Sequence, residues 1–184
     1  MKKLYIPILL VFIIAAALVE QGCDILNNLF LDQALKQTIV TSGNNSIIEQ
    51  AETFCLSDYD AFDDNVDNIE SITYVSAAYF TESYSSGLTG TNIQVTLYAG
   101  DTEFAPMIWQ VTIPFGQASD YVDNPYEIML TPDQITEFNS ALENYEINDC
   151  YTAKLTVEDV NDNDGAPYSL TGRVEIVVQM EIKP

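Results

Sequence analysis

The stretch Tyr168-Ser-Leu-Thr-Gly-Arg-Val-Glu-Ile-Val-Val-Gln-Met-Glu-Ile182 points to the fold class of this chain. In its second half, apolar residues alternate with polar ones: Val174, Ile176, Val178 and Met180 against Glu175, Gln179 and Glu181. A period of two is typical of a β-strand that buries one face and exposes the other. We therefore expect a strand over this stretch, with one face against a core.

Similar patterns predict further strands along the chain. They cover residues 34–41, 46–54, 69–82, 93–97, 107–113, 126–130 and 150–160, and turn residues such as Gly87 and Gly90 separate them. In 69–82 both alternating rows are largely apolar, which indicates a strand covered on both sides or one running past a sheet edge. The acidic segment 57–68 has near-helical spacing and predicts one or two helical turns.

One amphipathic helix is predicted over residues 132–145. Thr131 is a suitable N-cap, Pro132 suits the first helical position, and Gln134 completes a capping box. Apolar side chains then recur on one face, at Ile135, Phe138, Leu142 and Tyr145. This face should lie against the strands.

Seven or eight short strands with one helix predict an all-β fold, an antiparallel immunoglobulin-like β-sandwich. We expect a single sandwich domain over 34–184, preceded by a signal peptide at 1–22 and a tether at 23–33. A fold of this class hosts many unrelated functions, so function must come from other features.

The first 22 residues resemble a bacterial export signal. Lys2 and Lys3 precede an apolar run over 4–19, whose 16 residues fall short of the roughly 20 needed to span a membrane. Ala15 and Ala17 form a small-x-small pattern, and cleavage after Ala17 would release a secreted protein. The Gly22-Cys23 pair resembles a bacterial lipobox, which implies acylation of Cys23 and a membrane-anchored lipoprotein, periplasmic or surface-exposed.

The cysteine count favours the lipoprotein. The chain has three cysteines, Cys23, Cys55 and Cys150, and an odd number in an exported protein needs an explanation. If Cys23 carries lipid, Cys55 and Cys150 are left to form a disulfide in an oxidising compartment. Secretion without lipid would leave one thiol over.

Charge and composition restrict the function further. Removing the signal takes away Lys2, Lys3 and Glu20, which leaves 4 basic against 27 acidic residues and a net charge of −23. Nucleic acid is excluded as a partner, because its binding requires Lys and Arg to neutralise phosphates. The chain has no His, which removes the commonest general base and zinc ligand.

One acidic loop has the composition of a calcium site. Its candidate oxygen ligands are Glu158, Asp159, Asn161, Asp162, Asn163 and Asp164. The run from Asp159 to Asn163, followed by Ala166-Pro167, resembles the calcium linker of cadherins. The same residue types also suit a hairpin turn. A second acidic cluster at Asp58, Asp60, Asp63, Asp64 and Asp67 would add ligands if it folds nearby.

These features together predict a non-catalytic binding or structural module of the cell envelope. It would be held at the membrane by its N-terminal lipid, would require no cofactor except an optional calcium ion, and would bind an envelope protein or an extracellular glycan. The alternative is a carboxylate-dependent hydrolase of extracellular glycans, which would need two carboxylates at a suitable separation in a cleft.

Overall fold

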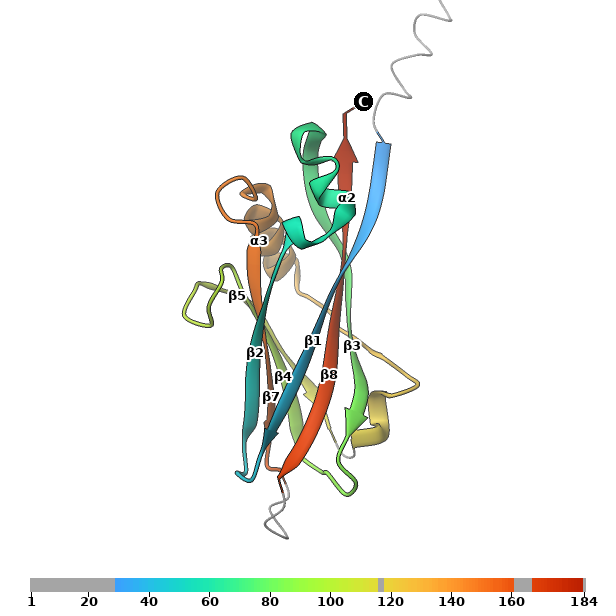
Figure 1. Cartoon of the computed structure of the whole chain (residues 1–184), viewed down its shortest axis with the longest axis vertical. Helices are drawn as coiled ribbons and strands as arrows, with labels where there is room; N and C mark the ends of the chain where they lie inside the picture. The colour runs from blue at the N-terminus through green and yellow to red at the C-terminus, as the bar shows by residue number, and fades with distance from the viewer. Residues whose placement is uncertain (1–28, 116–117, 161–166, 184) are drawn as a thin grey trace, which may run out of the picture.

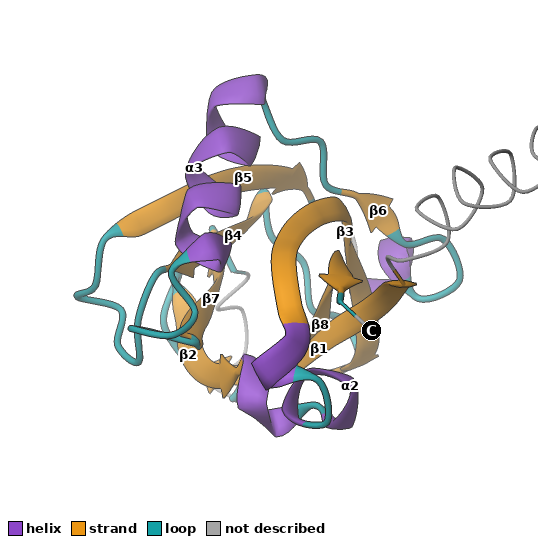
Figure 2. Ribbon diagram, turned by 90° about the horizontal axis from the view of Figure 1, so that it is seen from above, coloured by secondary structure: helices purple, strands orange, loops and turns teal. Residues whose placement is uncertain are grey.

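The computed structural model describes residues 29–115, 118–160 and 167–183. Two four-stranded antiparallel sheets pack face to face, and a helix lies along one side of them (Figures 1 and 2). The predicted all-β antiparallel sandwich with one amphipathic helix is confirmed. The signal peptide, Cys23 and most of the acidic loop lie outside the described residues.

Within the described residues, eight strands form the sandwich. They are β1 (Leu29–Gly43), β2 (Ile48–Cys55), β3 (Ile69–Tyr84), β4 (Asn92–Tyr98), β5 (Met107–Pro114), β6 (Tyr126–Glu127), β7 (Cys150–Glu158) and β8 (Tyr168–Ile182). The first strand starts earlier than expected, because Leu29 and Leu31 pair with Ile182 and Met180 of β8. Residues 29–33, expected in the tether, are therefore part of the sheet.

The strand pairing determines the connectivity. The sheets have the orders β1-β8-β3-β6 and β2-β7-β4-β5. The chain is therefore folded like one long hairpin, whose first four strands pair with its last four: β1 with β8, β2 with β7, β3 with β6 and β4 with β5. Eight strands in two such sheets form a jelly roll. An immunoglobulin domain instead has its first, second, fourth and fifth strands in one sheet. The sandwich is thus of jelly-roll rather than immunoglobulin-like connectivity.

The two apolar rows of β3 have a different cause from the one expected. The register with β8 shifts between Tyr74 and Ser76, which is an irregularity of the β-bulge type. Before the shift Ile72 lies in the core, and after it the buried positions are Ala77 and Tyr79. One extra residue moves the buried row from even to odd numbers, so both rows are apolar although the strand buries one face.

Helix α3 (Pro132–Glu143) seals the open side of the sandwich, between the edges of the two sheets. Its N-cap is Thr131, with the predicted capping box to Gln134. Phe138 and Leu142 are fully buried, and the helix packs against β3 and β5. The backbone N–H of Tyr74 donates to Asn139 Oδ1 at 2.8 Å, so the helix also satisfies a backbone group of β3. The opposite side is closed where β1 lies beside β2.

The acidic segment after β2 forms short helical turns, as predicted. They are the 3-10 turn η2 (Leu56–Asp58), the single α-helical turn α2 (Asp60–Asp63) and the 3-10 turn η3 (Val66–Asn68). Phe62 is the buried anchor of this segment, and its ring meets that of Tyr145 edge to face. The segment forms one end of the sandwich, where β1 begins and β8 ends (Figure 1).

Candidate functional site

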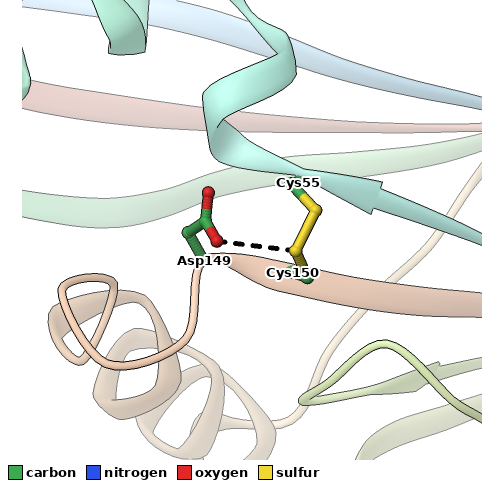
Figure 3. Close-up of side chains that lie close together, drawn as sticks. All are labelled: Cys55, Asp149 and Cys150. Atoms are coloured by element: carbon green, nitrogen blue, oxygen red, sulfur yellow. Dashed lines mark hydrogen bonds between the residues drawn. A yellow bond between two sulfur atoms is a disulfide. The ribbon is translucent and has the colours of Figure 1, made fainter.

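The predicted disulfide between Cys55 and Cys150 is confirmed. The last residue of β2 and the first residue of β7 face each other across the sheet, with the two sulfur atoms 1.98 Å apart (Figure 3). The bond closes a loop with a sequence separation of 95 residues. In the chain-entropy model such a crosslink stabilises the fold by about 4–5 kcal/mol.

Asp149 lies next to the disulfide and accepts hydrogen bonds from the helical turn beside it. Its backbone carbonyl accepts from Leu56 N–H at 2.8 Å, and its carboxylate accepts from Ser57 N–H at 3.2 Å. Asp149 Oδ1 also lies 3.5 Å from Cys150 Sγ (Figure 3). Cys55, Asp149 and Cys150 are close enough together to form a metal site. Because the sulfurs are joined to each other, neither is a thiolate able to ligate a metal.

The structure describes two residues of the candidate calcium loop. Glu158 lies on the outer face of the β7 sheet, where its carboxylate accepts from Gln94 Nε2 at 2.9 Å and Asn92 Nδ2 at 3.4 Å. Asp159 has a left-handed backbone with φ of 51°, and its carboxylate accepts from Thr91 Oγ1 at 2.8 Å. Both carboxylates therefore have protein partners. Asn161, Asp162, Asn163 and Asp164 lie outside the described residues, so calcium binding stays a prediction.

The second acidic cluster does not add ligands to this loop. Its five residues lie in or beside the turns at one end of the sandwich: Asp58, Asp60, Asp63, Asp64 and Asp67. Strand β7 ends and β8 begins at the other end (Figure 1). The long strands β1, β3 and β8 separate the two groups. The condition for added ligands, that this cluster folds near the loop, is not met, because the acidic segment follows β2 at the end opposite to the β7–β8 connection.

Every cation of the described residues takes part in an ion pair. Lys36 lies 3.6 Å from Glu175, Lys183 lies 3.2 Å from Glu70, and Arg173 pairs with both Glu82 and Glu175 while stacking on the Phe80 ring. The fourth cation is Lys154. Each Lys and Arg in the described part of the chain therefore has at least one carboxylate partner.

Lys154 sits in a polar pocket on the outer face of the β7 sheet. Its ammonium group lies 3.0 Å from Glu49 and 2.9 Å from Glu103. Burial alone would lower the pKa of Lys154, but the hydrogen bonds to Glu103 and Glu49 outweigh it and raise this pKa. Both carboxylates are thus partners of a single cation on this face of the sheet.

A loop that reverses over the sheet completes this pocket of about 290 Å³. Thr152 Oγ1 donates to Gly100 O at 2.8 Å, and Thr53 Oγ1 donates to Asp101 O at 3.2 Å. The β4–β5 connection is thereby held across the outer face, which brings Glu103 to Lys154. Sequence analysis missed this pocket, because no alternation or spacing indicates that a loop folds back onto a sheet.

A second and larger hollow lies between α3 and the start of β5. Its volume is about 530 Å³, within the range of ligand-binding pockets. Its β-sheet wall includes Pro106, Met107 and Ile108, and its helix wall carries Asp133 and Glu137 one turn apart. Helical periodicity predicted the core face of α3. It did not predict that part of the opposite face would line a groove.

Comparisons with known proteins give no family for this chain. No protein-family model and no curated protein matches the sequence. Solved structures of Desmodium yellow mottle tymovirus, Mud crab tombus-like virus and Tobacco necrosis virus are similar at 8%, 12% and 10% identity. They cover 85%, 86% and 84% of this chain and 89%, 84% and 97% of theirs, with TM-scores of 0.35, 0.34 and 0.30. Scores this low assign neither fold nor function.

The class of protein is therefore taken from the structure itself: a disulfide-linked, acidic β-sandwich of eight strands with one sealing helix. Among the described residues, no helix is long and apolar enough to cross a membrane.

Proposed function

We propose that this chain is an exported, lipid-anchored protein of the bacterial cell envelope that acts as a non-catalytic binding or structural module. The Cys55–Cys150 disulfide carries the proposal. Such bonds persist in oxidising compartments outside the cytoplasm. Because the bond uses two of the three cysteines, Cys23 is the one left over, directly after the small residue that a lipobox requires.

The position of the first strand supports a close attachment. Five residues, 24–28, separate Cys23 from Leu29, where β1 begins. Even fully extended, this connection spans only about 20 Å. A lipid on Cys23 would hold the end of the sandwich that carries the disulfide and α2 next to the bilayer. The other end, with Glu158 and Asp159, would then face away from it.

Charge supports attachment through lipid rather than through the protein surface. The described residues carry only Lys36, Lys154, Arg173 and Lys183 as cations, and each is already paired with a carboxylate. Anionic lipids attract proteins through clusters of basic residues. This surface would be repelled instead, so the acyl chain supplies the membrane affinity.

Metabolic labelling with radioactive palmitate tests the proposal in a bacterial host that processes lipoproteins. The full-length chain should be labelled and should sediment with membranes, whereas Cys23→Ser should be unlabelled. The double variant Cys55→Ser with Cys150→Ser is the control that keeps Cys23, and it should retain the label. An unlabelled wild-type protein whose N-terminus lies directly after Ala17 would replace anchoring with secretion.

Calcium stabilisation by the loop over 158–164 is a second part of the proposal. A cation that binds only the native state raises the melting temperature with the logarithm of its concentration. Calcium should therefore raise the melting temperature more than magnesium at equal ionic strength, and Asp162→Ala should remove the difference. Equal responses to both ions would mean that salt only screens the self-repulsion of an acidic protein.

A further inference from the structure

We propose that the groove between α3 and β5 binds an extended, basic peptide segment of a partner protein. This inference deepens the proposed function, since it names the surface and the partner chemistry by which an envelope module would act. Three features of the groove carry it: an unpaired strand edge, a pair of carboxylates without a described cation as partner, and an exposed methionine on the sheet wall.

The first feature is the edge of β5. This strand ends the sheet order β2-β7-β4-β5, and no described strand pairs with its outer side. The groove of about 530 Å³ is lined by Met107 and Ile108 at the start of this strand, and of these two residues Met107 is exposed. An exposed edge offers backbone N–H and C=O groups to an added strand. A groove between a strand edge and other structure is a recurrent site for binding extended peptides.

The second feature is the charge of the helix wall. Asp133 and Glu137 lie four residues apart on α3, so their side chains neighbour each other on one face. Both are exposed, and neither belongs to an ion pair with another described residue. All four described cations are engaged elsewhere, so a partner segment that carries Lys or Arg would complement this wall.

The third feature is the exposed apolar side chain of Met107 in the groove. Met107 is 51% exposed within the sheet wall, and Phe104, two residues before Pro106, is 91% exposed. An exposed apolar side chain in a groove can pack against an apolar side chain of a bound segment, and this contact removes both from water. The favoured segment therefore combines Lys or Arg with apolar residues.

A second copy of this chain does not fit the groove as well. From Cys23 on, a copy would bring a net charge of −23, and its described cations are already paired. Like-charge repulsion opposes such an association. A partner with free Lys or Arg on an extended segment avoids this cost and supplies the missing charge.

Fluorescence anisotropy with the full-length chain in nonionic detergent tests the inference. The probe is a labelled seven-residue peptide of alternating lysine and valine. Its counterparts replace lysine by glutamate, or methylate alternate backbone nitrogens to block strand pairing. The lysine peptide should bind, with an affinity that falls as salt rises, and both counterparts should bind at least tenfold more weakly. Equal binding by the methylated peptide would overturn the pairing with β5.

Matched variants locate the binding. Asp133→Asn with Glu137→Gln should weaken binding about three- to tenfold, as expected for the loss of two exposed ion pairs. Glu143→Gln with Glu146→Gln removes the same charge from outside the groove and should change binding less than twofold. Ser140→Trp, which fills the groove without changing charge, should abolish it. Equal weakening by the two charge variants, or unimpaired binding by Ser140→Trp, would overturn the inference.

The peptide-binding experiment and the palmitate experiment test different proposals, so either proposal can fail without the other. If the chain carries no lipid but binds the lysine peptide, the proposal of peptide binding in the groove stands and that of lipid anchoring is refuted. If the chain is labelled but binds none of the peptides, lipid anchoring stands and peptide binding in the groove is refuted.

Discussion

Gly172 leaves the space in which Tyr79 lies. A Cβ atom at position 172 would be 2.7 Å from Tyr79 Cε2 and 2.8 Å from Leu155 Cδ2, closer than real Cβ atoms approach. Gly172 is an inward-facing residue of β8, between β1 and β3, while Leu155 comes from the facing sheet. The missing side chain thus allows a large ring from one strand to lie across its neighbour within the core.

Gly172→Ala should therefore destabilise the protein by about 1–3 kcal/mol, as overpacking of a core does. Urea unfolding measures the cost. In a double-mutant cycle, the substitution should cost less in a Leu155→Ala background, because one of the two obstructing groups is gone. Strictly additive costs would show that the close approach to Leu155 does not matter.

Removing the disulfide should have a larger effect. Cys55→Ala with Cys150→Ala should lower the free energy of unfolding by about 4–5 kcal/mol, because the 95-residue separation leaves a large unfolded ensemble unrestrained. Chemical reduction of the wild-type chain is the control and should give the same loss. Non-reducing peptide mapping should find the 55–150 crosslink; two free thiols in the exported protein would contradict it.

The cap of α3 has a smaller, local role. Thr131 Oγ1 accepts from Gln134 N–H at 3.3 Å, and the Gln134 side chain accepts from Thr131 N–H at 2.9 Å. Thr131→Ala should cost about 1 kcal/mol of stability, whereas Thr131→Ser should cost little because it keeps the hydroxyl acceptor. Urea unfolding of the two variants makes the comparison. If serine and alanine at position 131 were equally destabilising, the hydroxyl of Thr131 would not be the group that caps α3.

Local features of the fold were predictable because each depends on residues close in sequence. The alternation in β8 corresponds to a strict alternation of buried and less buried residues from Tyr168 to Ile182. The Thr131–Gln134 capping box is likewise a local pattern. Cysteine parity indicated the bond between Cys55 and Cys150, since only two cysteines were left to pair.

Pairing between strands was not predictable in the same way. Alternation marks a buried face but carries no information about the neighbouring strand, so jelly-roll and immunoglobulin orders give similar patterns. The contact between Glu103 and Lys154 depends on the loop that folds over the sheet, and the groove at Met107 depends on where α3 packs. These sites arise from tertiary packing, which a single sequence does not encode in its periodicity.

Tyr79 makes the stability of the fold sensitive to alkaline pH. Its side chain is fully buried and its hydroxyl lies 3.3 Å from Thr81 Oγ1. Burial raises the pKa of Tyr79 to about 12, opposed by the hydrogen bond to Thr81 and supported by the charge of nearby Tyr121. In the unfolded chain a tyrosine ionises near pH 10. The native state therefore holds a proton that the unfolded state loses between pH 10 and pH 12.

The sign follows from proton linkage. Below pH 10 both states are protonated and the contribution of Tyr79 is complete, and above that pH unfolding releases a proton. The free energy of unfolding should fall by about 1.4 kcal/mol per pH unit for this group between pH 10 and pH 12. Burial also raises the pKa of Tyr151, so this residue acts in the same direction.

Urea unfolding from pH 8 to pH 11.5 tests this dependence. Tyr79→Phe keeps the ring and removes the ionisable group. Above pH 10 the free energy of unfolding of this variant should fall less steeply with pH than that of the wild type, because unfolding releases about one proton fewer. Tyr84→Phe is the control, because Tyr84 is exposed and a change there should leave the wild-type slope intact. If Tyr79→Phe and the wild type decline with the same slope, ionisation of Tyr79 does not couple to unfolding, and alkaline sensitivity must come from the other tyrosines.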